Sequence, residues 1–184
     1  MLDSKDAKAI KGELPRPGSV MYNFHFKDDQ SKRKTLKKWQ KLNKYLMVPL
    51  YRVKILPLFG LGKIFLILTT KGWKTGKTRR TPLEYRKYKE DIVIFAARGE
   101  NATWVKNLRA YPESVTIMLG FHKFKPKIDS ISDMQQKIDI LKWYITKFGK
   151  AAKVLFGWNP KEDTLENTDL SHLAALTTIF KLKK

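Results

Sequence analysis

Basic residues crowd a glycine-containing turn in the segment 68–85, LTTKGWKTGKTRRTPLEY. Two glycines within five residues indicate a tight turn between strands, which would present free backbone N–H groups. Five cations surround that turn: Lys71, Lys74, Lys77, Arg79 and Arg80. Converging cations and backbone donors bind phosphate or carboxylate groups. The spacing is neither a P-loop nor a GxGxxG turn. The segment therefore predicts an anion site, with a merely solvated hairpin tip as the competing interpretation.

A second segment, FAARGENATWVKNLRAYP at 95–112, could accept a flat ring. Ala96 and Ala97 end a strand with very small side chains, as a site needs where a ring lies against the backbone. The helix that follows carries Trp104 and Asn107. Trp104 could stack on a ring, although a core tryptophan is the favoured interpretation. Asn107 could bind a ligand or brace the turn, and a solvent-exposed asparagine is the ordinary expectation.

Charge and composition narrow the function. Lys and Arg number 38 against 17 Asp and Glu, giving a formal charge of +21, and such a chain favours a polyanion or an anionic surface. The chain has no cysteine, and its three histidines lack ligand-like spacing, so no metal site is predicted. The charged start resembles no signal peptide, and the longest apolar run is far too short to span a bilayer. A cytoplasmic protein, peripheral on the inner membrane face if it docks there, is expected.

A basic amphipathic helix is predicted over 32–47. Leu36, Trp39, Leu42 and Leu46 recur at helical spacing among many lysines. Such a helix could lie on an anionic membrane surface with its apolar stripe buried. Covering one end of the protein core is the favoured alternative.

Short strands and a few helices make up the rest of the chain. Residues 1–30 read as a flexible arm, and 31–184 as one domain. A capping box, Ser132 with Gln135, opens the second long helix. Predicted strands cover 63–70, 79–88, 91–97, 115–119, 122–128 and 174–182, and predicted helices cover 101–111 and 132–149. This pattern indicates an α+β domain of antiparallel strands with flanking helices; a small barrel is one such arrangement, and the pattern alone does not choose the topology.

The basic segment 68–85 and the small-residue segment 95–112 together resemble the deazaflavin-dependent nitroreductase family. Its members carry LTT-x-G-[RK]-K-[ST]-G-x-x-R-x-x-P-L, then a small-residue turn and W-x-x-N-L-x-x-x-P. The similarity spans 64–119. Three features depart from the pattern: Trp73 replaces a frequent arginine, the turn after Ala97 is short, and Glu84 stands where some members have an aromatic residue.

The resemblance implies a split β-barrel of the FMN-binding-like type that binds coenzyme F420, with FMN as the alternative cofactor. The basic hairpin would hold the phosphate, and the small-residue turn would lie near the deazaflavin. The implied cofactor residues are Lys74, Thr75, Gly76, Arg79, Pro82, Ala96, Ala97, Arg98, Gly99, Trp104 and Asn107. The enzyme would be an F420H2-dependent reductase that transfers hydride to a quinone, an enone or a nitro compound.

The cofactor carries the reactivity in such a reaction, so no side-chain nucleophile is expected. Tyr85, Tyr144 or water could supply the proton. Tyr144, Phe156 and Trp158 are predicted to contact the substrate, because the aromatics of the segment 154–158 look exposed. A nucleic-acid binder is disfavoured, since no such motif is present. A membrane-surface protein without catalysis is the other alternative, and the oligomeric state stays open.

Overall fold

The computed structural model describes residues 13–52 and 64–183 and divides the chain into two compact units. The helical unit combines residues 1–28 with 132–176, and the barrel unit combines 29–131 with 177–184. The predicted single domain over 31–184 is thus divided differently in the structure. The segment 132–176 leaves the barrel unit and packs with the N-terminal residues instead.

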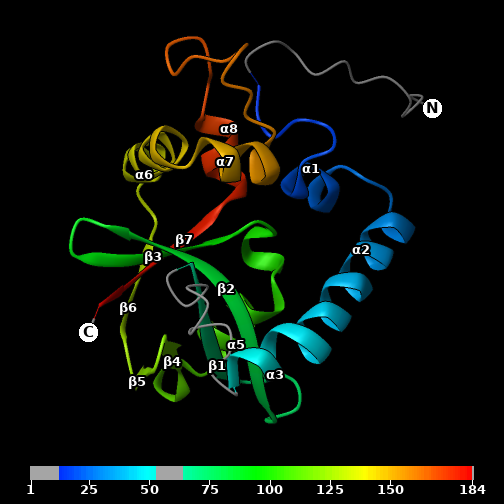
Figure 1. The fold of residues 1–184 in the computed structure, drawn as a ribbon, viewed down its shortest axis with the longest axis vertical. Helices are drawn as coiled ribbons and strands as arrows, with labels where there is room; N and C mark the ends of the chain where they lie inside the picture. The colour runs from blue at the N-terminus through cyan, green and yellow to red at the C-terminus, as the bar shows by residue number, and fades with distance from the viewer. Residues whose placement is uncertain (1–12, 53–63, 184) are drawn as a thin grey trace. The chain divides into compact units, whose positions relative to one another are not determined.

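The barrel unit contains one seven-stranded antiparallel sheet, in the order β5-β4-β1-β2-β3-β7-β6 (Figure 1). The strands are β1 Phe65–Lys71, β2 Thr78–Tyr88, β3 Asp91–Ala96, β4 Thr116–Leu119, β5 His122–Phe124, β6 Lys127–Ile131 and β7 Thr178–Lys183. The predicted strands 63–70, 79–88 and 91–97 are found as β1, β2 and β3, and they form an antiparallel meander because β2 pairs with both neighbours.

The two edge strands of this sheet are consecutive in the chain. Only Lys125 and Pro126 separate β5 from β6, although these strands end the sheet on opposite sides. The chain from Phe124 to Lys127 can span at most about 11 Å, so the sheet must curl until its edges approach. The predicted α+β split β-barrel with flanking helices is confirmed.

The predicted strand 122–128 is wrong, because it joins the two edges of the barrel. His122, Phe124, Pro126 and Ile128 alternate as a strand would. Proline lacks the N–H that a continuous ladder needs, and it fixes its own backbone angle. The chain therefore leaves one edge at Phe124 and joins the other at Lys127.

The first four residues of β1, Phe65–Leu68, are all apolar because both faces of the strand are covered there. Leu66 and Leu68 lie in the main core of the barrel. Ile67, which points the opposite way, packs with Met47, Leu50, Phe65 and Met118. A strand buried on two faces reads as a continuous apolar run rather than an alternating one.

The helices of the barrel unit are α2 Asp29–Leu42, the π-helix η1 Asn43–Met47, α3 Val48–Arg52, the 3-10 helices η3 Gly99–Asn101 and η4 Pro112–Ser114, and α5 Thr103–Ala110. The predicted helix over 32–47 is confirmed. Its predicted cover of the core is seen at its last residue, Met47, which packs against Ile67 as Leu50 of α3 also does. The structure describes every residue of α2 and η1, and none of them is buried.

The helical unit consists of α1 Val20–His25, α6 Met134–Lys147, α7 Gly149–Phe156 and α8 Ser171–Leu176. The predicted flexible arm is wrong for residues 13–28, because Leu14 and Met21 are buried and α1 follows a Ser19 cap. Helix α6 begins one residue later than the predicted capping box, with Asp133 accepting from the amide of Gln136. Helix α8 replaces the start of the predicted strand 174–182.

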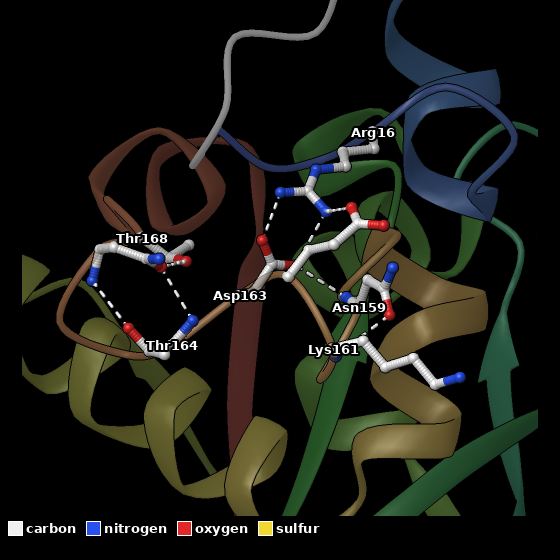
Figure 2. A network of polar contacts seen from close by, with 8 residues as sticks. Arg16, Asn159, Lys161, Asp163, Thr164 and Thr168 are labelled. Carbon is white, nitrogen blue, oxygen red and sulfur yellow. Dashed lines mark hydrogen bonds and ion pairs between the residues drawn. The ribbon is translucent and has the colours of Figure 1, made fainter.

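A polar network fixes the N-terminal segment of the helical unit to the loop after α7 (Figure 2). The Arg16 guanidinium donates to both carboxylate oxygens of Asp163, with 2.8 Å between Nη1 and Oδ2. Asp163 also accepts from the amide of Asn159 at 2.7 Å. The backbone N–H of Arg16 donates to the Phe156 carbonyl at 2.9 Å. These bonds satisfy a carboxylate that is only 5 % exposed.

Gly157 ends α7 where the N-terminal segment passes, and we expect Gly157→Ala to destabilise the protein. Its φ is +84°, and a Cβ there would lie 2.8 Å from the Arg16 Cβ. The backbone conformation alone costs an L-residue about 1–2 kcal/mol, and the close contact adds to that cost. Gly18→Ala is the matched control, because Gly18 has a φ of +88° with no atom within 4 Å. Thermal unfolding should show a lower midpoint for Gly157→Ala than for the control, and equal midpoints would contradict the contact.

Candidate functional site

The turn between β1 and β2 uses its own backbone donors. Gly72 donates to the Lys77 carbonyl at 2.9 Å, and the amides of Thr75 and Gly76 both donate to the Gly72 carbonyl. The amide of Trp73 donates to Asn107 Oδ1 at 3.0 Å. The predicted set of free backbone N–H groups is therefore wrong. Within this described turn, the Lys74 amide makes none of these bonds.

Both glycines of the turn are required by its geometry. Gly76 has a φ of +64°, which L-residues rarely adopt. A Cβ on the buried Gly72 would lie 3.0 Å from Thr75 Oγ1 and 3.2 Å from the Lys77 carbonyl oxygen. The turn is a closed, internally bonded structure in which a side chain at Gly72 lacks space and one at Gly76 would require a strained backbone.

Cationic side chains surround the closed turn and are exposed to solvent. Lys71, Lys74, Lys77, Arg79 and Arg80 all reach the surface. The sequence from Lys71 to Leu83 contains no acidic residue that could neutralise them. An anion at this turn would be held by charge-assisted bonds from side chains, rather than by a nest of backbone amides. The donor set thus fits a phosphate or carboxylate group.

Trp73 lies at the centre of the cationic group. Its side chain is 42 % exposed, and the ammonium groups of Lys74 and Lys106 lie 4.8 Å and 5.8 Å from its ring centroid. Lys71 lies in the same way over the Tyr111 ring, at 4.7 Å. Such cation–π contacts orient the ammonium groups. Sequence reasoning missed Lys106, although its place one residue before Asn107 puts it beside the turn.

Asn107 is buried rather than exposed, which corrects the ordinary expectation for an asparagine. Only 2 % of its surface is accessible. Its Oδ1 accepts from the Trp73 amide, and its Nδ2 donates to Thr70 Oγ1 at 3.2 Å. The alternative that Asn107 braces the turn is confirmed by these bonds. They tie α5 to both β1 and the basic turn.

The small-residue turn after β3 leads directly into α5. Ala96 is 1 % exposed and Gly99 is buried, while Ala97 and Arg98 are partly exposed. Partial burial lowers the pKa of the Arg98 guanidinium from its ordinary value. Asn101 lies in η3, so the helix predicted over 101–111 begins later than expected, with Ala102 in the N-cap position of α5.

Glu100 anchors this turn to the sheet. It accepts two bonds from the Arg109 guanidinium, at 2.7 Å and 2.6 Å. It also accepts from Thr178 Oγ1 on β7, at 3.0 Å. Sequence reasoning did not identify this role, since nothing in the local pattern pairs Glu100 with a residue 78 positions away.

Trp104 and Tyr85 belong to the barrel core. Trp104 is 9 % exposed, and its ring centroid lies 5.7 Å from that of Phe180. The favoured interpretation of Trp104 as a core tryptophan is confirmed. Tyr85 is 6 % exposed in the same cluster, which also includes Ala96. Burial raises the pKa of the Tyr85 phenol, and the nearby Arg86 charge opposes that shift only in part, so Tyr85 keeps its proton at neutral pH.

The three aromatics predicted to contact substrate are packed within the helical unit. Tyr144 and Phe156 have no exposed surface, and Trp158 is 6 % exposed. The Tyr144 ring centroid lies 5.8 Å from that of Phe156 and 5.5 Å from that of Phe148. The expected exposure of these aromatics is wrong, because they fill the core beneath α6 and α7. Their substrate role stays a prediction.

Helix α5 brings the two sequence motifs together. Its first turn continues from the small-residue turn at 96–99, and Asn107 one helical turn later bonds the basic turn. Lys74, Thr75, Gly76 and Arg79 are exposed, and Pro82 is partly exposed on β2. Pro82 pairs with Ile67 of β1, and the residues of β2 that pair with β3 come later in the strand. At Pro82 there is therefore no β3 residue to which a backbone N–H would donate, so proline is tolerated there.

Comparison with protein families identifies the class. Residues 55–138 match the family described as F420H(2)-dependent quinone reductase. The predicted resemblance to deazaflavin-dependent reductases is thereby confirmed. Over these residues, which are fewer than half of the chain, it is similar to F420H2-dependent reductases, enzymes that use coenzyme F420, and its strands form a split β-barrel.

Solved structures with related folds are more distant in sequence. An F420-H2 dependent reductase is 18 % identical, with 66 % of this chain and 95 % of that chain covered at a TM-score of 0.44. A FAD-binding protein from Mesorhizobium loti is 15 % identical, with 67 % and 84 % covered at a TM-score of 0.41. A search of the curated proteins gives no match to this sequence.

Residues 13–52 and 64–183 hold neither a metal-ion cluster nor a membrane-spanning helix. No group of three His, Asp or Glu residues there is placed to hold a metal ion. No helix in the same residues is long and apolar enough to cross a bilayer.

Proposed function

We propose that the chain reduces a quinone-like acceptor at a site formed by the basic turn and the small-residue turn. The observation that carries this proposal is the pair of bonds from Asn107, which fixes both motifs to one helix. The family description supports a quinone over the enone and nitro acceptors also considered. The partly exposed Ala97 and Arg98 would lie beside the ring, and the exposed cations would lie beside its anionic handle.

The residues of this site divide by burial into two roles. Lys74, Thr75, Gly76 and Arg79 are exposed and would hold the phosphate. Pro82, Ala97 and Arg98 are partly exposed and would border the deazaflavin. The buried members of the implied set, which would shape the site from behind, are Ala96, Gly99, Trp104 and Asn107.

Bound reduced F420 supplies a hydride, and one proton completes the two-electron reduction of the acceptor. Tyr85 is the better placed of the two tyrosines considered, since it shares the barrel core with Ala96 and Trp104. Its raised pKa keeps the phenol protonated. Tyr144 lies in the other unit with no exposed surface. Water is the alternative donor, and Tyr85→Phe distinguishes them by its effect on the rate.

A binding and turnover experiment tests the proposal. The full chain is mixed with oxidised F420 or with FMN and passed through gel filtration while the visible spectrum is recorded. F420 should travel with the protein and FMN should not. Reduced F420 is then oxidised with menadione, cyclohexenone or a nitroaromatic as acceptor, and menadione should give the highest kcat/KM. Absence of F420 from the protein peak would overturn the proposed cofactor binding. Turnover with the nitroaromatic alone would overturn the proposed quinone acceptor.

We also propose that α2 and η1 dock on an anionic membrane surface. Their large apolar side chains are exposed: Trp39 44 %, Leu42 39 %, Tyr45 68 % and Leu46 46 %. Lysines flank this apolar stripe along the whole helix. A basic helix with an uncovered aromatic and aliphatic face has the character of an interfacial helix. Such docking would place the enzyme beside membrane quinones.

We expect the protein to sediment with vesicles containing phosphatidylserine and to remain free with phosphatidylcholine vesicles. Replacing Trp39 and Leu46 together by serine should weaken vesicle binding at least about 10-fold, since burial of each apolar side chain contributes roughly 1.5–3 kcal/mol. Lys150→Gln with Lys153→Gln, on the exposed side of α7, is the control for general charge. Equal binding by the serine variant and the wild type would exclude insertion of the apolar stripe.

A further inference from the structure

Asn107 joins three segments of the barrel unit from a buried position. It projects from α5 and bonds the last buried residue of β1, Thr70, as well as the Trp73 amide in the basic turn. Thr70 and Asn107 are each 2 % exposed. A buried amide side chain without hydrogen-bond partners destabilises the folded state. These two bonds supply those partners.

The two polar atoms of the Asn107 side chain each match the hydrogen-bonding chemistry of their partner. Trp73 offers a backbone donor, which requires an acceptor, and Asn107 presents its oxygen there. Thr70 Oγ1 accepts from the amide nitrogen. Both polar atoms of Asn107 are engaged inside the protein, so its role does not need a contact with a ligand.

The bond to the Trp73 amide fixes where the cationic side chains meet. The ammonium groups of Lys74 from the turn and of Lys106 from α5 both lie over the Trp73 ring. Lys106 is the residue directly before Asn107. If the amide of Trp73 were released, the turn and α5 would lose the shared anchor that brings these two cations to one indole.

We infer that Asn107 is a positioning residue rather than a cofactor ligand. Through the Trp73 amide it holds the turn 72–77 in the conformation that presents Lys74 and its neighbours to the anionic part of F420. This inference rests on the proposed site at the basic turn. It assigns Lys106, which lies over the same ring, to the cationic group as well.

The anchor is tested first in the absence of cofactor. Hydrogen exchange of the Trp73 amide is measured by NMR in the wild type, in Asn107→Leu and in Asn107→Asp. The amide should exchange slowly in the wild type and at least about 10-fold faster in Asn107→Leu, which removes a net bond of about 1.4 kcal/mol. Asn107→Asp retains an acceptor and should restore the protection. Unchanged exchange in Asn107→Leu would overturn the anchor, whether or not F420 binds.

The positioning role is tested next by F420 titration. Asn107→Leu should raise the Kd for F420 at least about 10-fold, the loss expected when one bond of about 1.4 kcal/mol no longer holds the site in shape. Val93→Ala, a fully buried change on β3, is the control for lost stability. Its Kd should stay within twofold of the wild type. An unchanged Kd in Asn107→Leu, or an equal rise in Val93→Ala, would overturn the role. A wild type that does not bind F420 would instead refute the proposed function.

Discussion

Replacing Lys74 and Arg79 together by glutamine is expected to weaken F420 binding by about 100-fold or more. Each charge-assisted bond to an anion contributes roughly 1.5–3 kcal/mol, and two such losses exceed the 2.7 kcal/mol that corresponds to about 100-fold in Kd. Both side chains are exposed beside a turn whose amides are mostly engaged. The side chains must therefore supply most of the free energy of binding to the anion. Fluorescence titration of oxidised F420 measures the change.

The control for this experiment removes two positive charges elsewhere. Lys150→Gln with Lys153→Gln on α7 changes the net charge by the same amount, and both lysines are exposed. We expect its Kd to stay within about twofold at moderate salt, because these two lysines do not belong to the cations of the basic turn. Equal weakening in both double variants would mean that F420 responds to net charge, and the basic turn would lose its assigned role.

The basic turn shows what the sequence could and could not predict. Its position between two strands, its two glycines and its exposed cations all follow from residue type and spacing. The free backbone donors did not follow, because closure of the turn by Gly72, Thr75 and Gly76 depends on exact backbone geometry. The bond from Trp73 to Asn107 joins residues 34 positions apart, and no local pattern carries that information.

The fold was predictable to a similar depth. Local apolar patterns placed β1, β2, β3 and α5 almost as the structure has them. The break between β5 and β6 was missed because apolar and polar residues continue to alternate across Pro126. Only the N–H that proline lacks indicates that this segment forms two edge strands rather than one strand. The helical unit was missed because its parts lie more than 100 residues apart in the chain, at 1–28 and 132–176.

The aromatics of the helical unit illustrate the same limit on predicting a site. Phe156 and Trp158 follow the predicted helix 132–149 and have no obvious partner in the sequence, which favours exposure. In the structure Phe156 packs on Tyr144, and its carbonyl accepts from the Arg16 amide. The N-terminal residues bury this segment. Their charge and prolines had indicated a flexible arm.

That N-terminal partner depends on one carboxylate, and Asp163→Asn is expected to destabilise the protein by about 3 kcal/mol. Removing one member of a buried ion pair costs about 3–5 kcal/mol, because the other charge stays buried without compensation. The lower end applies here, since the Arg16 side chain keeps 15 % of its surface exposed and Asp163 keeps 2 %. Asparagine can still accept from the Asn159 amide, so the change isolates the bonds to Arg16.

Urea denaturation of the intact chain, followed by tryptophan fluorescence, measures this loss through Trp143 and Trp158 in the helical unit. Glu162→Gln is the matched control: its carboxylate lies 3.9 Å from the same guanidinium, but its side chain is 64 % exposed. An exposed pair of this kind contributes about 0–1 kcal/mol. The two neighbouring carboxylates thus differ in burial far more than in distance to Arg16. Equal loss from both variants would show that burial does not set the strength of this contact, and that Asp163 does not hold the N-terminal segment in place.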